Sequence, residues 1–319
     1  MKKILLSVVI SLFACNYTIG ATLQRTILSH NGNLTQYDAT VWKNAITDAV
    51  AGDTVYFTAG YFSGELTIDK PITLIGMGVS ETDHLLYLNV AGVPYVPGSS
   101  TTLTSSVKVS IPGDVTLTSC LMEGFNFNGT TGITVTESVT GLSIRRCKFY
   151  GSFKAEAMVN NLTLESCYVG SLYCSNLTNP DVHNCCVSSL YTESIEGLNF
   201  TNCFFSQGSN VKNCYFTNCI VNASSTYFSY NTYVNCIYAS SDSNSTYTNC
   251  WRFTNGQSLT AAEIAEKGYL GTDGTVVGIY GGLAPFTFRP SHPYIEEGTT
   301  EYDATNKVLN VSMKVKRGE

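Results

Sequence analysis

Short alternations of apolar and polar residues recur through the middle of the chain, and most of them end in Asn-Cys. Two apolar positions are separated by one variable residue, and a second variable residue precedes the closing pair. The copies are VTLTSC (115–120), LSIRRC (142–147), LTLESC (162–167), PDVHNC (180–185), LNFTNC (198–203), CYFTNC (214–219), NTYVNC (231–236) and STYTNC (245–250). They begin 14 to 27 residues apart. A drifting period of about twenty residues, built from short strands, predicts a β-solenoid.

Each unit predicts a short strand followed by a corner. The two apolar side chains point inward, because alternate residues of a strand share a face. Asn is predicted to adopt a left-handed or bridge-region conformation at the corner, and its amide can hydrogen-bond the Asn of a neighbouring coil. Cys then opens the next strand as a small inward residue. Stacked cysteines about 4.8 Å apart have parallel Cβ vectors, which disfavours a disulfide, so we expect a column of buried thiols.

The segments on either side of the repeats predict caps. TVWKNAITDAVAG (40–52) has the period of a helix, with Thr40 as N-cap, and places Trp42, Ala45, Ile46, Ala49 and Val50 on one face that would cover the first coil. LTAAEIAEK (259–267) predicts a second helix, and VLNVSMKV (308–315) predicts a strand. The predicted divisions are a signal peptide (1–20), an N-terminal cap (21–52), β-helix coils (53–256) and a C-terminal cap (257–319).

Two stretches resemble a known superfamily. GDTVYFTAGYFSGELTIDKPITLIGMG (52–78) resembles the first coils of the pectin lyase-like, right-handed parallel β-helix proteins. GTDGTVVGIYGG (271–282) resembles the closing segment of many secreted bacterial β-helix proteins. The resemblance implies an all-β, right-handed parallel β-helix. It implies little about activity, because that superfamily contains lyases, glycosidases, adhesins and proteins without known chemistry. A pentapeptide-repeat solenoid is the alternative fold.

The residue directly after each motif Cys is predicted to point outward, and most of these residues are apolar. They are Leu121, Lys148, Tyr168, Cys186, Phe204, Ile220, Ile237 and Trp251. An uncovered apolar stripe of this length would be unusual on a monomer. Three explanations stay open: the tail (283–317) folds over it, a partner or ligand covers it, or the inward–outward register is shifted. As ligand-binding residues we predict Tyr168, Phe204, Ile220, Ile237 and Trp251.

Composition and the N-terminus narrow the function classes. Only 13% of the residues are charged and the net charge is −6, without a basic block, which argues against a nucleic-acid partner. MKKILLSVVISLFACNYTIG predicts export, because a basic start precedes an apolar run too short to span a bilayer. Cleavage after Gly20 and lipidation at Cys15, within the lipobox-like LFAC, both remain open. The predicted location is therefore secreted or in the cell envelope, with no transmembrane segment after the signal.

Candidate chemistry is sparse. The outward position two before the Cys carries Arg145, Glu165 and His183 in successive coils, with Asp181 beside His183. In a polysaccharide lyase, Arg145 could bind a substrate carboxylate and His183 could act as the base. The non-functional alternative is a row of weakly paired charged side chains on the surface. Tyr215 and Tyr230 are candidate surface rings for sugars. We expect no metal site and no cofactor. A non-catalytic protein that binds a glycan or a surface protein is favoured, with a lyase or glycoside hydrolase, or a structural adhesin, as alternatives.

Overall fold

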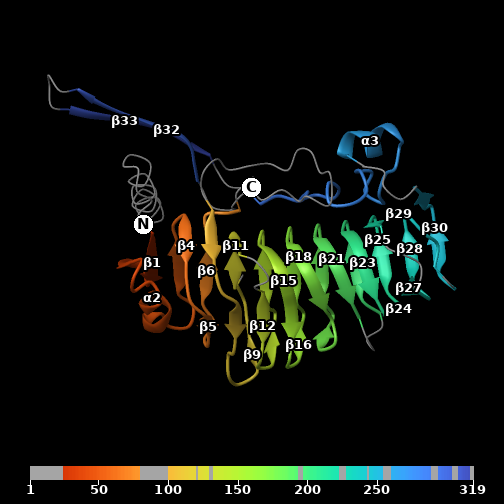
Figure 1. Ribbon diagram of the computed structural model, residues 1–319, viewed down its shortest axis with the longest axis horizontal. Coiled ribbons are helices and arrows are strands. Elements are labelled where there is room, and N and C mark those ends of the chain that lie inside the picture. The colour runs from red at the N-terminus through yellow and green to blue at the C-terminus, as the bar shows by residue number, and fades with distance from the viewer. Residues whose placement is uncertain are drawn as a thin grey trace.

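The computed structural model describes residues 24–79, 100–119, 121–128, 132–192, 197–222, 228–242, 244–253, 260–288, 294–303 and 308–316. It confirms the all-β class: parallel sheets form a solenoid of about eight turns, with two short helices. Figure 1 shows the coils stacked along the long axis of the molecule, with β1 and α2 at one end and β30 at the other. The predicted signal peptide, including Cys15, lies outside the described residues.

Sheet A has twelve strands and follows the motif strands of the repeats. In spatial order they are β2 (Asn33–Asp38), β1 (Arg25–His30), β3 (Thr54–Phe57), β6 (Thr73–Ile75), β10 (Met122–Glu123), β14 (Ser143–Arg145), β17 (Thr163–Glu165), β20 (Asp181–His183), β22 (Asn199–Thr201), β25 (Tyr215–Thr217), β28 (Thr232–Val234) and β30 (Thr246–Thr248). The pairing is parallel from β3 onward, and β1 is antiparallel to both of its neighbours.

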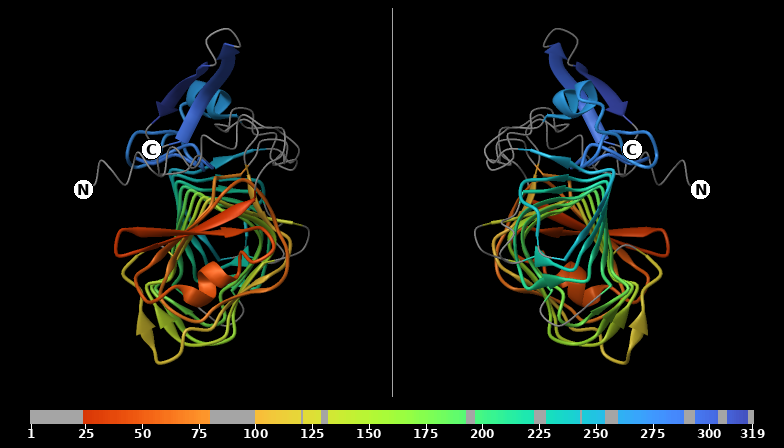
Figure 2. Two further views of the ribbon diagram at one scale, coloured as in Figure 1. Left: turned by 90° about the vertical axis from the view of Figure 1, so that its left-hand side faces the viewer. Right: turned by 90° about the vertical axis from the view of Figure 1, so that its right-hand side faces the viewer.

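Sheet B has thirteen strands, and seven of them begin directly after a motif cysteine. It contains β4 (Gly60–Phe62), β5 (Leu66–Ile68), β7 (Thr101–Leu103), β8 (Val107–Val109), β11 (Phe125–Phe127), β12 (Ile133–Val135), β15 (Lys148–Ala155), β18 (Tyr168–Tyr173), β21 (Cys186–Tyr191), β23 (Phe204–Ser209), β26 (Ile220–Val221), β29 (Ile237–Tyr238) and β31 (Trp251–Arg252). Sheet C contains β9 (Val115–Thr116), β13 (Val139–Thr140), β16 (Val159–Asn160) and β19 (Leu177–Thr178), and β24 (Val211–Lys212) pairs with β27 (Phe228–Ser229). Figure 2 shows the coils superposed in the view along the axis.

The corners between sheets depend on left-handed residues. The residue before each motif Cys has a positive φ in every described coil from Arg146 (52°) to Asn249 (52°), which confirms the predicted role of Asn. A second left-handed residue stands six positions before the same Cys. This second set is Gly141, Asn161, Asn179, Gly197, Asn213, Tyr230 and Asn244, with φ between 50° and 78°. Gly and Asn dominate because they tolerate this conformation at low cost.

The first motif copy was aligned wrongly. Val115 of VTLTSC belongs to sheet C, where it pairs with Val139. The residue that pairs with Ile144 in sheet A is Met122, and Asn126 pairs with Lys148 in sheet B. Leu121 therefore does not belong to the outward stripe; it is 1% exposed. The cysteine of this copy, Cys120, lies outside the described residues.

The N-terminal lid is present, but its helix is shorter than expected. α2 spans Asn44–Asp48, and Lys43 rather than Thr40 occupies its N-cap. Trp42 is buried and packs edge-to-face against Phe57 and Phe62, with ring centroids 5.8 and 5.6 Å away. Val50 is 49% exposed, so its predicted place on the apolar face was wrong. The antiparallel pair β1–β2, which the sequence did not predict, extends sheet A from the edge of β3.

The C-terminal elements confirm two predictions and correct a third. α3 (Ala261–Glu266) begins after Thr260, which forms a capping box with Glu263. β33 (Val308–Lys316) pairs antiparallel with β32 (Tyr294–Asp303). The segment that includes α3, residues 260–288, runs back along the side of the coils rather than closing their end (Figure 1). We call residues 260–288 the return segment.

Candidate functional site

The outer face of sheet A brings the four predicted polar residues together. Arg145 pairs in register with Glu165, and Glu165 pairs with His183 on the next coil. Asp181 precedes His183 by two residues on β20, so its side chain lies on the same face. The column that the sequence predicted is therefore present, while a catalytic role for it stays a prediction.

The contacts within this cluster are short on the Arg145 side and longer on the His183 side. Arg145 Nε lies 3.0 Å from Glu165 Oε2. His183 Nε2 lies 3.9 Å from the same carboxylate oxygen, and His183 Nδ1 lies 3.2 Å from Asp181 Oδ1. Asp181 is the most open member, with 68% of its side chain exposed, and Glu165 is the most enclosed, with 17% exposed. Glu165 thus lies between the Arg145 guanidinium and the His183 imidazole.

The same contacts shift two pKa values. The hydrogen bond to Asp181 raises the pKa of His183 above its usual value, although burial opposes this, and the charges of Asp181 and Glu165 add to the increase. The hydrogen bond to His183 lowers the pKa of Asp181. The cluster therefore favours a protonated imidazole that bridges two carboxylates. As a base, His183 would first have to lose this favoured proton.

Further exposed side chains continue from the cluster along sheet A. Asp181 pairs in register with Asn199, and Asn199 pairs with Tyr215. Asp181 and Asn199 are exposed, and Tyr215 is 50% exposed. Tyr230, at the left-handed corner before β28, is 57% exposed. Both tyrosines that the sequence marked as surface candidates are therefore open to solvent, whereas Tyr233, placed in the core, is 2% exposed.

The apolar stripe after the motif cysteines is a buried layer. Tyr168, Ile220 and Ile237 are 4%, 3% and 0% exposed, and Phe204 and Trp251 are half-buried. These residues form clusters apart from the core inside the coils, so they do point outward as predicted. The return segment covers them through its own apolar side chains, which are Ile264, Tyr269, Val276, Val277, Ile279, Tyr280, Phe286 and Phe288.

The prediction that this stripe is an exposed ligand-binding surface was therefore wrong. A fold-back of the chain was one of the three explanations left open. The covering residues run from Ile264 to Phe288, so they begin before the predicted tail (283–317) and include its Phe286 and Phe288. The sequence carries a signal that could have identified them. Val276, Val277, Ile279 and Tyr280 form an apolar group beyond the last motif copy, and such a group is stabilised by burial against another surface.

The corner asparagines fasten the return segment to the coils. Asn184 Nδ2 donates to the carbonyl oxygens of Ile279 (3.2 Å) and Gly281 (2.8 Å). Asn218 Oδ1 accepts from the Thr272 backbone N–H (3.1 Å), and its Nδ2 donates to Thr272 Oγ1 (3.3 Å). The predicted bond between neighbouring corner asparagines occurs between Asn249 Nδ2 and Asn235 Oδ1, 2.6 Å apart. Asn in these positions therefore serves both the corner and the attachment.

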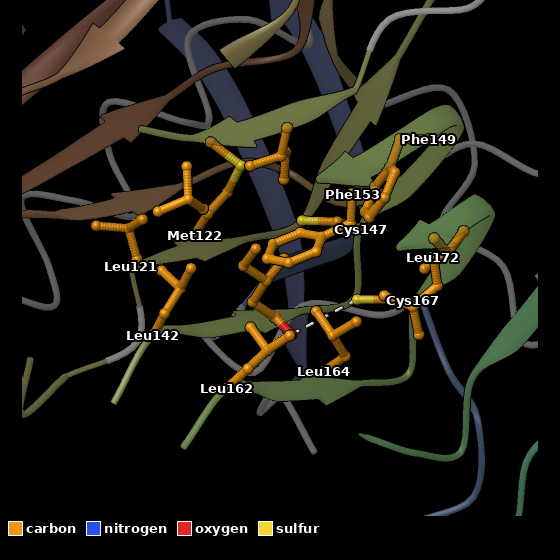
Figure 3. Close-up of a cluster of buried hydrophobic side chains, with 14 of the residues drawn as sticks. Leu121, Met122, Leu142, Cys147, Phe149, Phe153, Leu162, Leu164, Cys167 and Leu172 are labelled. Carbon is orange, nitrogen blue, oxygen red and sulfur yellow. Dashed lines mark hydrogen bonds between the residues drawn. The ribbon is translucent and has the colours of Figure 1, made fainter. Parts of the chain in front are cut away.

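The motif cysteines line the core, as Figure 3 shows for Cys147 and Cys167 among the leucine and phenylalanine side chains of adjacent coils. The ten cysteines that the structure describes are thiols; nine are buried and Cys250 is half-buried. The thiol of one coil accepts from the backbone N–H of the preceding Cys, as between Cys203 N and Cys219 Sγ (3.4 Å). It also donates to backbone carbonyls, as from Cys219 Sγ to the Thr217 oxygen (3.3 Å). Cys is thus a small core residue that also completes the corner's hydrogen bonds.

Burial opposes the ionisation of two of these thiols. It raises the pKa of Cys185 and Cys186 well above the usual value, because a thiolate inside the core would lose its hydration.

Within the described residues, no group of three or more His, Cys, Asp or Glu side chains is placed to hold a metal ion. No helix among those residues is long and apolar enough to cross a membrane.

Comparison of the chain with protein-family models, with curated proteins and with solved structures found no match. The class of the protein therefore rests on its own geometry: it is a parallel β-solenoid with a return segment along one side.

Proposed function

We propose that this chain is a secreted, non-catalytic β-helix protein that binds a glycan on the outer face of sheet A. We place it in the pectin lyase-like superfamily, with the right-handed coil of that group. The resemblance of residues 52–78 and 271–282 to that group supports the assignment. The leader-like sequence of residues 1–20 supports export, with lipidation at Cys15 as the alternative to cleavage after Gly20.

One observation carries the binding proposal: Asp181, Asn199 and Tyr215 form an exposed column in register. Successive coils place these side chains about 4.8 Å apart on a flat surface. A carboxylate and an amide can bond sugar hydroxyl groups, and a phenol ring offers an apolar face for a pyranose. A glycan lying along the solenoid axis would meet all three groups.

The charges of the site favour a neutral glycan over a polyanion. Arg145 is paired with Glu165 at 3.0 Å, and His183 lies beside Asp181 at 3.2 Å. Glu165 and Asp181 therefore already occupy the two groups that could bind an anion, and the whole chain carries a net charge of −6. An acidic polysaccharide would have to displace these pairs, which costs part of its binding energy.

The same contacts argue against the lyase alternative. A lyase of this fold needs a cation that neutralises the uronate carboxylate and a base that is free to take a proton. Here the Arg145 guanidinium is paired with Glu165, and carboxylates lie near both ring nitrogens of His183. Arg145 and His183 therefore interact with carboxylates of the protein itself and are not available to a substrate carboxylate or proton.

A panel of soluble polysaccharides, neutral and uronate-containing, tests the proposal by affinity electrophoresis and ultraviolet absorbance. We expect retardation by a neutral member, lost in Tyr215→Ala and Asn199→Ala, without new absorbance from an unsaturated product. Tyr61→Ala is the matched control, because Tyr61 is 66% exposed on β4 of sheet B. Absorbance that appears with a uronate polymer and disappears in His183→Ala would establish the lyase instead. Retardation by no polysaccharide would leave a surface protein or a structural adhesin role and refute glycan binding.

A further inference from the structure

The last two strands form a ribbon of their own. β32 and β33 pair antiparallel with each other and with no other strand among those that the structure describes. They have ten and nine residues, whereas the longest strand in the described part of the coils, β15, has eight. Figure 1 shows the pair reaching away from the coils. We call β32 and β33 the C-terminal ribbon.

A two-stranded ribbon by itself is an unstable arrangement in water. Isolated hairpins are marginally stable at best, and three or more strands are needed for independent stability. Among the residues that the structure describes, no strand pairs with the outer edge of β32 or of β33, so each edge presents a row of backbone N–H and C=O groups. Long edges of this kind are templates for pairing with another chain.

The sequences of the two strands differ in charge. β32 (YIEEGTTEYD) contains four acidic residues and no basic one, whereas β33 (VLNVSMKVK) contains two lysines and no acidic residue. Within the ribbon, Glu297 pairs in register with Lys314. Pairing β32 with another β32 would bring acidic strands together, which is destabilising. Pairing β33 with another β33 would leave its lysines without an acidic partner.

We propose that the C-terminal ribbon joins copies of this chain, with the free edge of β33 in one copy pairing antiparallel with the free edge of β32 in the next. Each β32 strand then lies between two β33 strands, one from its own copy and one from a neighbouring copy, and each β33 strand lies likewise between two β32 strands. The contact is heterologous, so each pairing leaves one β32 edge and one β33 edge open. Assembly therefore continues beyond a dimer.

This inference does not depend on what sheet A binds. It adds a consequence for any ligand, because a row of linked copies presents several identical faces to one long polymer. Linked sites bind with higher apparent affinity than a single site, provided that all of them can reach the ligand.

The test is the mass distribution of the full-length secreted chain, measured by sedimentation velocity over a wide range of concentration. We expect wild type to form a series of species whose mean mass increases with concentration. Lys314→Glu/Lys316→Glu should stay monomeric, because both ribbon strands are then acidic. Lys212→Glu/Lys267→Glu, the same charge change on β24 and beside α3, should assemble like wild type.

Two variants with opposite charge changes distinguish the loss of pairing between copies from the unfolding of the ribbon itself. Glu296→Lys/Glu297→Lys/Glu301→Lys/Asp303→Lys should also be monomeric alone, because β32 then carries only basic charges, like β33. An equimolar mixture with Lys314→Glu/Lys316→Glu should assemble again into particles that contain both chains. A monomeric wild type, a wild-type dimer that never grows, assembly of the Lys314→Glu/Lys316→Glu variant, or failure of the mixture to assemble would each overturn the proposal.

Discussion

The attachment of the return segment can be weakened without touching the core, by removing the side chain of a corner asparagine. Asn218→Gly deletes the two hydrogen bonds to Thr272, whose lengths are 3.1 and 3.3 Å. Gly tolerates the positive φ of 55° at this corner, so the turn itself should persist. The backbone bond from Gly278 N to the Asn218 oxygen, 2.7 Å long, is retained.

The expected loss follows from the two bonds. A net contribution of about 0.5–1.5 kcal/mol each gives roughly 1–3 kcal/mol less free energy for opening the return segment. Since about 1.4 kcal/mol corresponds to a factor of ten, amide exchange through local opening should become roughly 5- to 150-fold faster. The buried layer that includes Ile220 and Ile237 should still hold the segment closed most of the time.

Hydrogen exchange monitored by mass spectrometry measures this directly. Amides of residues 269–288 should lose protection in Asn218→Gly, whereas those of β17, β20 and β22 should not. Asn161→Gly is the control, because Asn161 has nearly the same φ (53°) and lies on the exposed corner beside sheet C. Equal changes in the two variants, or unchanged protection in Asn218→Gly, would refute the idea that the corner amides fasten the return segment.

Three further predictions concern the lid, the thiols and the charged cluster. Trp42→Ala should cost about 3–5 kcal/mol in urea denaturation, because it empties a site lined by Phe57 and Phe62, and an unchanged midpoint would exclude the lid. The buried thiols should react with a thiol reagent only after denaturation, and intact-mass analysis of unreduced protein that shows several disulfides would contradict the thiol column. Stability from the His183–Asp181 pair should be greatest from about pH 4 to 6.5. It should fade as pH rises through the raised pKa of His183 or falls through the lowered pKa of Asp181, and His183→Gln should flatten this profile of melting temperature.

The fold was predictable because each coil repeats a local rule. The motif cysteines and the inward residues around them specify strand, corner and core together, and the left-handed φ at Asn184, Asn202, Asn218 and Asn235 follows that rule. The rule gave the wrong alignment at residues 115–120. Their sequence matches the motif, but their strand pairs in sheet C instead of sheet A. Sequence similarity between short units does not determine register when the coils differ in length.

The candidate site was predictable only as far as it follows the repeat. The spacing placed Arg145, Glu165 and His183 in one column, because strands in register bring equivalent positions together. The burial of Ile220 and Ile237 was not predictable in the same way. It depends on the return segment, which begins 23 residues after Ile237 and 40 residues after Ile220. The path of this segment is set by tertiary contacts such as those of Asn184 and Asn218.

The central claim, that sheet A carries the binding face, is tested most directly by titrating one bound neutral oligosaccharide into two matched tyrosine variants. Tyr215→Ala alters sheet A, whereas Tyr173→Ala alters sheet B, where the Tyr173 ring stacks on Tyr191 with centroids 4.6 Å apart. Calorimetry should show at least a tenfold weaker affinity for Tyr215→Ala, since burying a ring of this size against a ligand contributes roughly 1.5–3 kcal/mol and about 1.4 kcal/mol is a factor of ten. Tyr173→Ala should show no change. Unchanged affinity in Tyr215→Ala, or a loss confined to Tyr173→Ala, would contradict the account.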